Sequence, residues 1–296
     1  MRPVRSFLFI PGDSDRKLAK ADESGADAVI IDLEDAVAPA YKEAARETTA
    51  AFLAERPPSK RGPQLWVRVN PLDTHMTEED LTAVMPFSPD GIVHPKPEGA
   101  ADVRKLSELI DIHESRHRDE PIRAGILPIA TETAAAPFKL GTFADARLDR
   151  LAGLTWGAED LAAALGATGN RGPDGEWLFT YKMVRSMTLM AAHAAGVPAI
   201  ETLHADFRDE DGLRATSRAA RAEGFSGRLC IHPAQVGPVN ESFMPGLDEV
   251  EEARKIVAAF KAEPGAGTVG IDGKMYDVPH LKGAKRTIAV HEAFVG

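Results

Sequence analysis

Short apolar runs alternate along the chain with stretches whose apolar residues recur at helical spacing. Several runs are apolar without alternation, which is typical of parallel strands covered by helices on both faces. The eight expected strands are SFLFIP, DAVIIDLE, QLWVRVN, GIVHPK, AGILPIA, LAGLTWG, PAIETL and RLCIHP. Each is followed by an expected helix, over residues 16–23, 41–55, 78–85, 100–116, 134–143, 180–195, 210–223 and 248–261. Eight such units predict a (β/α)8 TIM barrel of the α/β class, with a doubly wound open sheet as the alternative.

Two segments depart from this alternation. Residues 167–177, ATGNRGPDGEW, are rich in Gly, Pro and Asn and predict a long loop at the mouth of the barrel. Beyond residue 263, the Asp272–Gly273 pair favours a tight turn between two short extended segments, and a final helix follows. The sequence therefore predicts a barrel over residues 1–263 and a C-terminal extension over residues 264–296.

Composition narrows the functional classes. The 296 residues include 45 Asp and Glu against 35 Lys and Arg, a formal net charge of −10 that argues against nucleic acid as a general partner. The one cysteine, Cys230, excludes an intramolecular disulfide and is typical of a reducing compartment. Because no apolar run approaches the roughly 20 residues that span a membrane, we expect a cytoplasmic protein without a membrane anchor.

Ionisable residues gather at the carboxyl ends of the expected strands, where TIM-barrel enzymes hold their catalytic groups. They are Asp32, Glu34, Asp35, Arg68, Lys96, Glu132, Glu159, Asp160, Glu201, His204 and His232. Glu132 of ATET and Asp160 of GAED come from adjacent expected strands. Two carboxylates suit Mg²⁺ or Mn²⁺, which leaves its other positions to water and substrate oxygens. The alternative for Asp35 and Asp160 is that each caps the following helix.

Arg68 is the clearest cation at a strand end, in LWVRVNP. Its planar guanidinium can hold a substrate carboxylate through two parallel hydrogen bonds. The alternative is an ion pair with Asp32 or Glu34 on the neighbouring strand, and both roles are compatible with one another. His232 is interpreted more readily as a structural histidine. The sequence contains no GxGxxG after the first strand, no GxxxxGK[ST] and no GxSxG, so nucleotide-phosphate loops and a serine hydrolase are not supported.

Over nearly its whole length the sequence resembles the HpcH/HpaI aldolase and citrate lyase beta subunit family, particularly its citrate lyase beta-like and malyl-CoA lyase-like branch. The matching segments are RSFLFIPGD, GADAVIIDLEDAVAP, VRVNPLDT, ILPIATET, GAEDLAAALGA, GFSGRLCIHPAQVGPVNESF and GKMYDVPHLKGAKR. The resemblance implies a Mg²⁺-binding TIM barrel that assembles as homotrimers or homohexamers. Two segments depart from the family's pattern: PKPEG stands where PKVES is common, and ATET stands where LIET is usual.

The resemblance also implies roles for individual residues. Arg68 would hold the carboxylate or keto oxygen of the substrate, and Glu132 and Asp160 would bind Mg²⁺. Glu34 and Asp35 would lie behind the metal and order its waters.

Two further roles concern the extension and the thioester. The resemblance implies that the extension packs on a neighbouring subunit, where Asp277 moves the proton at the α-carbon of the thioester. The basic candidates for binding the phosphates of CoA are Arg5, Lys17 and Lys96.

The implied activity is cleavage or formation of a carbon–carbon bond between an acyl thioester enolate and a 2-oxo acid. Expected substrates are 3-hydroxyacyl thioesters such as malyl-CoA, citramalyl-CoA or a citryl thioester, which yield an acetyl thioester and a 2-oxo acid. One alternative is thioesterase or synthase chemistry on the same CoA substrates. Others are the beta subunit of a citrate lyase complex, which takes its thioester from an acyl-carrier protein, and a binding barrel without catalysis.

Overall fold

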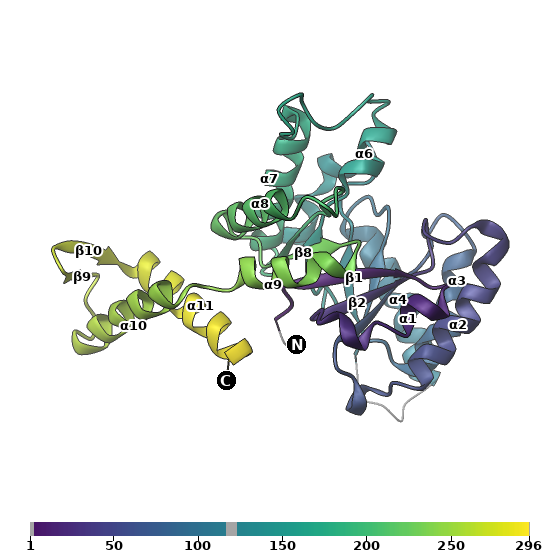
Figure 1. Ribbon diagram of the computed structural model, residues 1–296, viewed down its shortest axis with the longest axis horizontal. Coiled ribbons are helices and arrows are strands. Elements are labelled where there is room, and N and C mark those ends of the chain that lie inside the picture. The colour runs from purple at the N-terminus through teal and green to yellow at the C-terminus, as the bar shows by residue number, and fades with distance from the viewer. Residues whose placement is uncertain (1–2, 117–122, 296) are drawn as a thin grey trace. The chain divides into compact units, whose positions relative to one another are not determined.

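The computed structural model describes residues 3–116 and 123–295, and the chain divides into two compact units (Figure 1). The first unit is Val4–Val239, and the second is formed mainly by the residues from Asn240 onward.

The first unit is built on eight parallel strands. They are β1 (Ser6–Pro11), β2 (Ala28–Asp32), β3 (Gln64–Arg68), β4 (Gly91–His94), β5 (Gly125–Pro128), β6 (Leu154–Thr155), β7 (Ala199–Glu201) and β8 (Gly227–Cys230). Their order in the sheet is β5-β4-β3-β2-β1-β8-β7-β6. The two edges, β5 and β6, meet through the isolated parallel bridges Ile126–Leu151 and Ile129–Thr155, so the sheet nearly closes on itself. This confirms the expected (β/α)8 barrel and excludes the open doubly wound sheet.

Helices follow the strands in the expected alternation. They are α1 (Asp15–Leu18), α2 (Lys42–Ala54), α3 (Met76–Val84), α4 (Ala100–Arg116), α5 (Thr142–Asp145), α6 (Ala158–Ala164), α7 (Phe179–Ala194), α8 (Glu210–Glu223) and α9 (Val236–Phe243). Two expected helices are broken into short pieces. Residues 16–23 form α1 and a 3-10 turn at Asp22–Ser24, and residues 134–143 form a 3-10 turn at Ala136–Lys139 and the start of α5.

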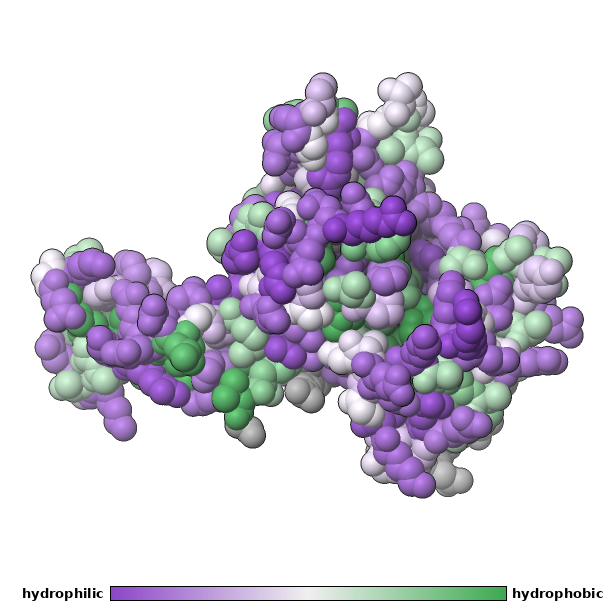
Figure 2. All heavy atoms as spheres, in the orientation of Figure 1, coloured by the Kyte–Doolittle hydropathy of each residue, from purple (hydrophilic) through white to green (hydrophobic). Residues whose placement is uncertain are grey.

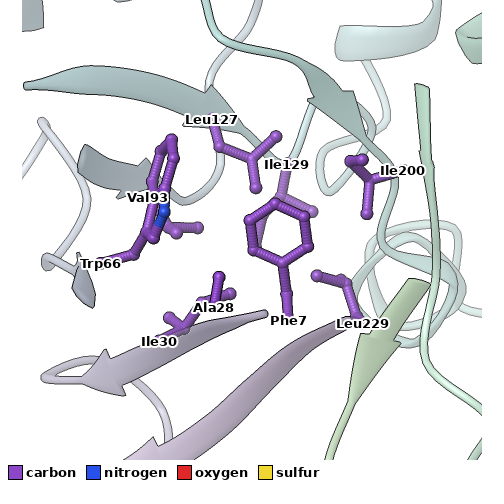
Figure 3. Packing of buried hydrophobic residues seen from close by; sticks show 9 residues of the cluster. All are labelled: Phe7, Ala28, Ile30, Trp66, Val93, Leu127, Ile129, Ile200 and Leu229. Carbon is purple, nitrogen blue, oxygen red and sulfur yellow. The ribbon is translucent and has the colours of Figure 1, made fainter. Parts of the chain in front are cut away.

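The barrel interior is filled by apolar side chains from all around the sheet. Figure 3 shows nine of them pointing toward one another: Phe7, Ala28, Ile30, Trp66, Val93, Leu127, Ile129, Ile200 and Leu229. The rings of Phe7 and Trp66 meet edge to face, with centroids 5.9 Å apart. Because these nine side chains are apolar, the chemistry is expected at the strand ends.

The second unit is a helical pair with a hairpin. It contains α10 (Leu247–Ala262), β9 (Thr268–Ile271), β10 (Lys274–Asp277) and α11 (Val278–Val295). The strands are antiparallel, and both residues of the Asp272–Gly273 turn have positive φ, which suits a two-residue hairpin. Ala253, Ile256, Phe260, Val269 and Ala284 form its core. Helix α10 covers the eighth expected helix, 248–261, and packs in the second unit; the two compact units divide after Val239.

Apolar residues appear on the drawn face of each unit only as patches among hydrophilic ones (Figure 2). Within residues 3–116 and 123–295, none of the helices combines the length and the apolar character needed to cross a membrane.

Candidate active site

Arg68 and Asp32 join the carboxyl ends of β3 and β2. The two residues are partners in the strand register, so their side chains start side by side. Arg68 Nε and Nη2 donate to the two carboxylate oxygens of Asp32 at 2.7 and 2.6 Å. Arg68 Nη1 lies 2.9 Å from Glu34 Oε2, which makes a second ion pair. Arg68 therefore forms the ion pair that was considered as an alternative, and it does so with both Asp32 and Glu34. One N–H group on each of Nη1 and Nη2 remains for another acceptor.

Asp32 also shapes the turn that follows β2. Its Oδ1 accepts a hydrogen bond from the Glu34 amide at 2.9 Å, and its Oδ2 accepts one from the Ala36 amide at 3.1 Å. Asp35, whose side chain is 59 % exposed, makes no such bond and contacts Lys96 instead. Asp35 therefore does not cap the following helix: neither the 3-10 turn at Pro39–Tyr41 nor α2 has a side-chain cap bond at its N-cap residue.

Lys42 holds the same turn from the other side. Its ammonium, at the start of α2, donates to the carbonyls of Leu33 and Glu34 and to Asn70 Oδ1 at 2.6–2.8 Å. Sequence reasoning missed Lys42. One signal was available, because a lysine in the first turn of a helix opposes the helix dipole and calls for another explanation.

Asn70 is fixed by the buried Asp80 of α3. Asp80 Oδ2 accepts from both the backbone amide and the side-chain amide of Asn70, each at 2.7 Å. Arg46 of α2 neutralises the other oxygen of Asp80 at 2.7 Å. Asp80 and Arg46 were also missed, because they lie on helices and act from behind the strand ends.

Lys96 brings the fourth strand into the cluster. Its ammonium contacts the carboxylates of three acids: Glu34, Asp35 at 3.2 Å and Asp160 at 3.3 Å. Its backbone amide donates to Glu132 Oε2 at 2.6 Å. The charge of Lys96 is thus directed into the acidic cluster, and its contact with a CoA phosphate stays a prediction.

Glu132 is a deeply buried acid whose surroundings disfavour its negative charge. It is only 4 % exposed to solvent. Burial and, after it, the neighbouring charges of Glu34 and Asp160 raise the pKa of Glu132 to about 8. Within the described part of the chain, no lysine or arginine side chain forms an ion pair with it. Gly157 permits this close packing, since a Cβ there would lie 2.8 Å from Glu132 Cγ.

Asp160 lies in the first turn of α6, next to Glu159. Neither acid accepts a hydrogen bond from a backbone N–H of α6, and the N–H of its N-cap residue Gly157 donates to Thr131 Oγ1 at 3.1 Å. Glu159 instead accepts a hydrogen bond from Asn170 Nδ2 at 2.9 Å, which ties the loop of residues 167–177 to α6. The carboxylate of Asp160, 33 % exposed, is left facing Lys96.

The cluster has more negative than positive charge. Its five carboxylates are Asp32, Glu34, Asp35, Glu132 and Asp160, and its ion pairs involve two cations, Arg68 and Lys96. A bound divalent cation would neutralise the buried negative charge of Glu132. No group of three or more His, Cys, Asp or Glu side chains in residues 3–116 and 123–295 is arranged to hold a metal by itself. The donor set therefore fits Mg²⁺, which takes one or two protein carboxylates and fills its shell with water.

The other expected site residues lie elsewhere. Arg5 precedes β1 and pairs with Asp27 before β2, at 2.8 and 2.9 Å, at the amino end of the barrel. Arg5 thus lies away from the carboxyl ends of the strands, and its contact with CoA stays a prediction. Lys17 is exposed on α1, which follows the carboxyl end of β1. Asp277 belongs to the second unit, where its carboxylate contacts His280 Nδ1.

The chain is similar in sequence to a known protein family and to several of its named members. Residues 5–233 match the family model described as HpcH/HpaI aldolase/citrate lyase. The chain is 37 % identical to a (3S)-malyl-CoA thioesterase of Cereibacter sphaeroides, over 98 % of this chain and 95 % of that protein. It is 31 % identical to the mitochondrial citramalyl-CoA lyase of Rattus norvegicus, over 97 % of this chain and 86 % of that protein.

The chain is also similar to a solved protein structure. The CitE protein of Mycobacterium tuberculosis, in complex with magnesium, acetoacetate and coenzyme A, superposes with a TM-score of 0.77 at 32 % identity. The match covers 98 % of both chains. The protein is therefore a member of the HpcH/HpaI aldolase/citrate lyase family.

Proposed function

We propose that this protein is a Mg²⁺-dependent carbon–carbon lyase. It would cleave a 3-hydroxyacyl-CoA such as malyl-CoA or citramalyl-CoA into acetyl-CoA and a 2-oxo acid, or run the reverse condensation. The observation that carries the proposal is the burial of Glu132 near the charges of Asp160 and Arg68. Among the described residues, no lysine or arginine side chain forms an ion pair with it. Further support comes from relatives: one is named a citramalyl-CoA lyase, and a citrate lyase beta subunit of M. tuberculosis is complexed with oxaloacetate and magnesium.

Glu132 and Asp160 are the residues that would hold the cation, Mg²⁺ or Mn²⁺. When bound, the cation polarises the carbonyl of the 2-oxo acid and stabilises the alkoxide from which that carbonyl forms. Glu34 and Asp35 would accept hydrogen bonds from waters behind it. Lys96 keeps Glu34 in place through its ammonium and Glu132 through its backbone amide.

Arg68 would bind the carboxylate or keto oxygen of the 2-oxo acid. Asp32 fixes its guanidinium through two hydrogen bonds, so the remaining N–H groups point in a set direction. A fixed positive charge beside an oxygen that gains negative charge lowers the barrier, because the group needs no reorganisation during the reaction.

Asp277 would handle the proton at the α-carbon. In the direction of cleavage the 3-hydroxyl group would lose its proton to water and become the carbonyl of the 2-oxo acid. The carbon–carbon bond would break to leave an enolate of the acetyl thioester, and Asp277 would give its α-carbon a proton. In condensation Asp277 would remove that proton. We propose that it does so in the site of a neighbouring subunit of a homotrimer or homohexamer. Arg5, Lys17 and Lys96 stay the basic candidates for a CoA phosphate, and among them Lys17 is exposed. A cytoplasmic location stays a prediction from the sequence.

A thioesterase is the second candidate, because the relative at 37 % identity is named a malyl-CoA thioesterase. In that case water attacks the thioester carbonyl, and the products are free CoA and the hydroxy acid. A beta subunit that takes its thioester from an acyl-carrier protein is a third candidate, supported by a relative of M. tuberculosis at 35 % identity that is named citrate lyase subunit beta-like.

A product-resolved assay distinguishes these functions. Malyl-CoA, citramalyl-CoA and citryl-CoA are incubated with wild type, with Asp160→Asn and with Asp149→Asn, in Mg²⁺ and in EDTA. Asp149→Asn is the matched control, because that acid precedes β6 at the amino end and its side chain is 77 % exposed. If the protein is a lyase, acetyl-CoA should form only with Mg²⁺. The Asp160→Asn variant should abolish its formation, and the Asp149→Asn variant should not.

Other products would change the conclusion. Free CoA with the hydroxy acid would identify a thioesterase. Activity that is indifferent to both EDTA and Asp160→Asn would contradict the metal site.

A further inference from the structure

Lys96 contacts both proposed metal ligands, each with a different part of the residue. Its backbone amide donates to Glu132 Oε2 at 2.6 Å. Its ammonium lies 3.3 Å from Asp160 Oδ1 and also contacts Glu34 and Asp35. A single residue therefore joins the two carboxylates that would share a cation.

The backbone of Lys96 is held in an unusual conformation to make these contacts. Its φ is 52°, in the left-handed region that side chains with a Cβ rarely adopt, and Pro97 follows. Such conformations persist where surrounding contacts fix them, and they concentrate at functional sites. Nearby, Gly99 has φ 124°, a conformation that a residue with a Cβ would not readily adopt.

A lysine ammonium carries a positive charge at neutral pH. The ammonium of Lys96 contacts the carboxylates of Glu34, Asp35 and Asp160. Lys96 therefore acts as a fixed positive charge at the place where a divalent cation would also bind Asp160.

We propose that the ammonium of Lys96 lowers the affinity of the Glu132–Asp160 pair for divalent cations by competing with them for Asp160. This inference rests on the proposed metal site, but it does not depend on which reaction the site performs. Two positive charges that share one carboxylate repel each other strongly in a partly buried site. A metal held this weakly exchanges readily, and a bound 2-oxo acid, which brings negative charge, would tighten it.

The opposite role is physically distinct. If Lys96 only held Glu34 and Asp160 in position for the metal, removing its charge would loosen the ligands and weaken metal binding. The direction of the change in affinity therefore separates a competitor from a positioning residue.

The test is Mn²⁺ binding, measured by calorimetry and by the electron paramagnetic resonance signal of free Mn²⁺, without substrate. The variants are Lys96→Met and Lys96→Gln, which remove the charge, and Lys96→Arg, which keeps it. Lys139→Met is the matched control, because Lys139 pairs with Glu98 at 2.8 Å in an exposed ion pair outside the cluster. Asp160→Asn serves to confirm that the measured site is the proposed one.

We expect both neutral variants to bind Mn²⁺ about 10-fold more tightly than wild type. Lys96→Arg should stay within about 3-fold of wild type and Lys139→Met should be unchanged. In EDTA, the neutral variants should unfold at a lower temperature than wild type, and Mn²⁺ should raise that temperature more than it does in wild type. Lys96→Gln keeps a hydrogen-bond donor for Glu34, so it tests the same inference if Lys96→Met does not fold.

Equal or weaker Mn²⁺ binding by both neutral variants, with binding lost in Asp160→Asn, would overturn this inference and leave the metal site standing. No Mn²⁺ binding by wild type would overturn both. Tighter binding in the neutral variants supports the inference even if the product assay identifies a thioesterase.

Discussion

Strand β2 carries an arginine–aspartate pair at each end, and the two pairs have very different surroundings. At the amino end, Asp27 pairs with Arg5 at 2.8 Å. At the carboxyl end, Asp32 pairs with Arg68 at 2.6 Å. The difference lies in what surrounds each pair.

At the amino end, Arg5 and Asp27 match each other in charge. Arg61 and Asp90 form a further pair there at 3.0 Å, before β3 and β4. At the carboxyl end, Glu34, Asp35, Glu132 and Asp160 surround the pair, and Lys96 is the additional cation in ion-pair contact with them. A balanced end needs nothing more for stability, whereas the unbalanced end needs a cation or a proton, and this is typical of a functional site.

Exchanging the arginine for lysine at each end should give the largest contrast. Arg68→Lys keeps the charge but loses the two-pronged geometry, so we expect kcat/KM to fall by at least about 100-fold. Arg5→Lys should leave kcat/KM unchanged and lower the free energy of unfolding by about 1 kcal/mol. Steady-state kinetics and urea unfolding of both variants provide the measurement. An equal loss of activity in both would remove the functional distinction between the two ends.

The pH dependence of metal binding should sharpen the contrast. A metal ligand must be deprotonated, and the pKa of Glu132 is raised to about 8 by burial and by Glu34 and Asp160. Mg²⁺ binding should therefore strengthen as pH rises toward 8 and level off above it, with roughly tenfold change per pH unit below 8. Calorimetric titrations from pH 6 to pH 9 should also show proton release on binding. An affinity that is flat over this range would contradict a protonated Glu132.

Neutralising one acid at each end should shift stability in opposite directions, with the smallest effect. The folded-state pKa of Glu132 lies above its usual 4.5, so its contribution to stability is present below about pH 4.5 and is lost as pH rises through about 8. In EDTA at pH 9, Glu132→Gln should therefore stabilise the protein by at least about 1 kcal/mol, and near pH 4 the gain should vanish.

Asp27→Asn is the matched variant, because it leaves Arg5 without its partner. It should lower the melting temperature at pH 9. Thermal melts of both variants at the two pH values test the pair. Destabilisation by Glu132→Gln at pH 9 would show that its charge is already balanced.

The sequence was sufficient for the barrel and for most of the acidic residues of the site. Apolar runs without alternation identify buried parallel strands, and the acids of DLED, ATET and GAED follow such runs directly. Their convergence then follows from the parallel arrangement, which brings all carboxyl ends of the strands to one end of the barrel.

Other features depend on three-dimensional contacts that the residue pattern does not contain. The direction of Lys96 depends on its left-handed backbone, which no spacing rule indicates. Lys42 reaches the DLED turn from α2 because the helix folds back over the strand ends. Helix α10 continues the strand–helix alternation in the sequence, yet its apolar face is covered by α11 and β9. The sequence also places Arg5 near the first strand without showing at which end its partner lies.

The most direct test of the account is the position of a bound metal. Crystals grown with Mn²⁺ and pyruvate would be used to measure anomalous scattering at the manganese absorption edge. We predict one peak at the carboxyl end of the barrel, in contact with carboxylate oxygens of both Glu132 and Asp160. A barrel without a peak there, or with Mn²⁺ bound only elsewhere, would contradict the claim that these buried acids form a metal site.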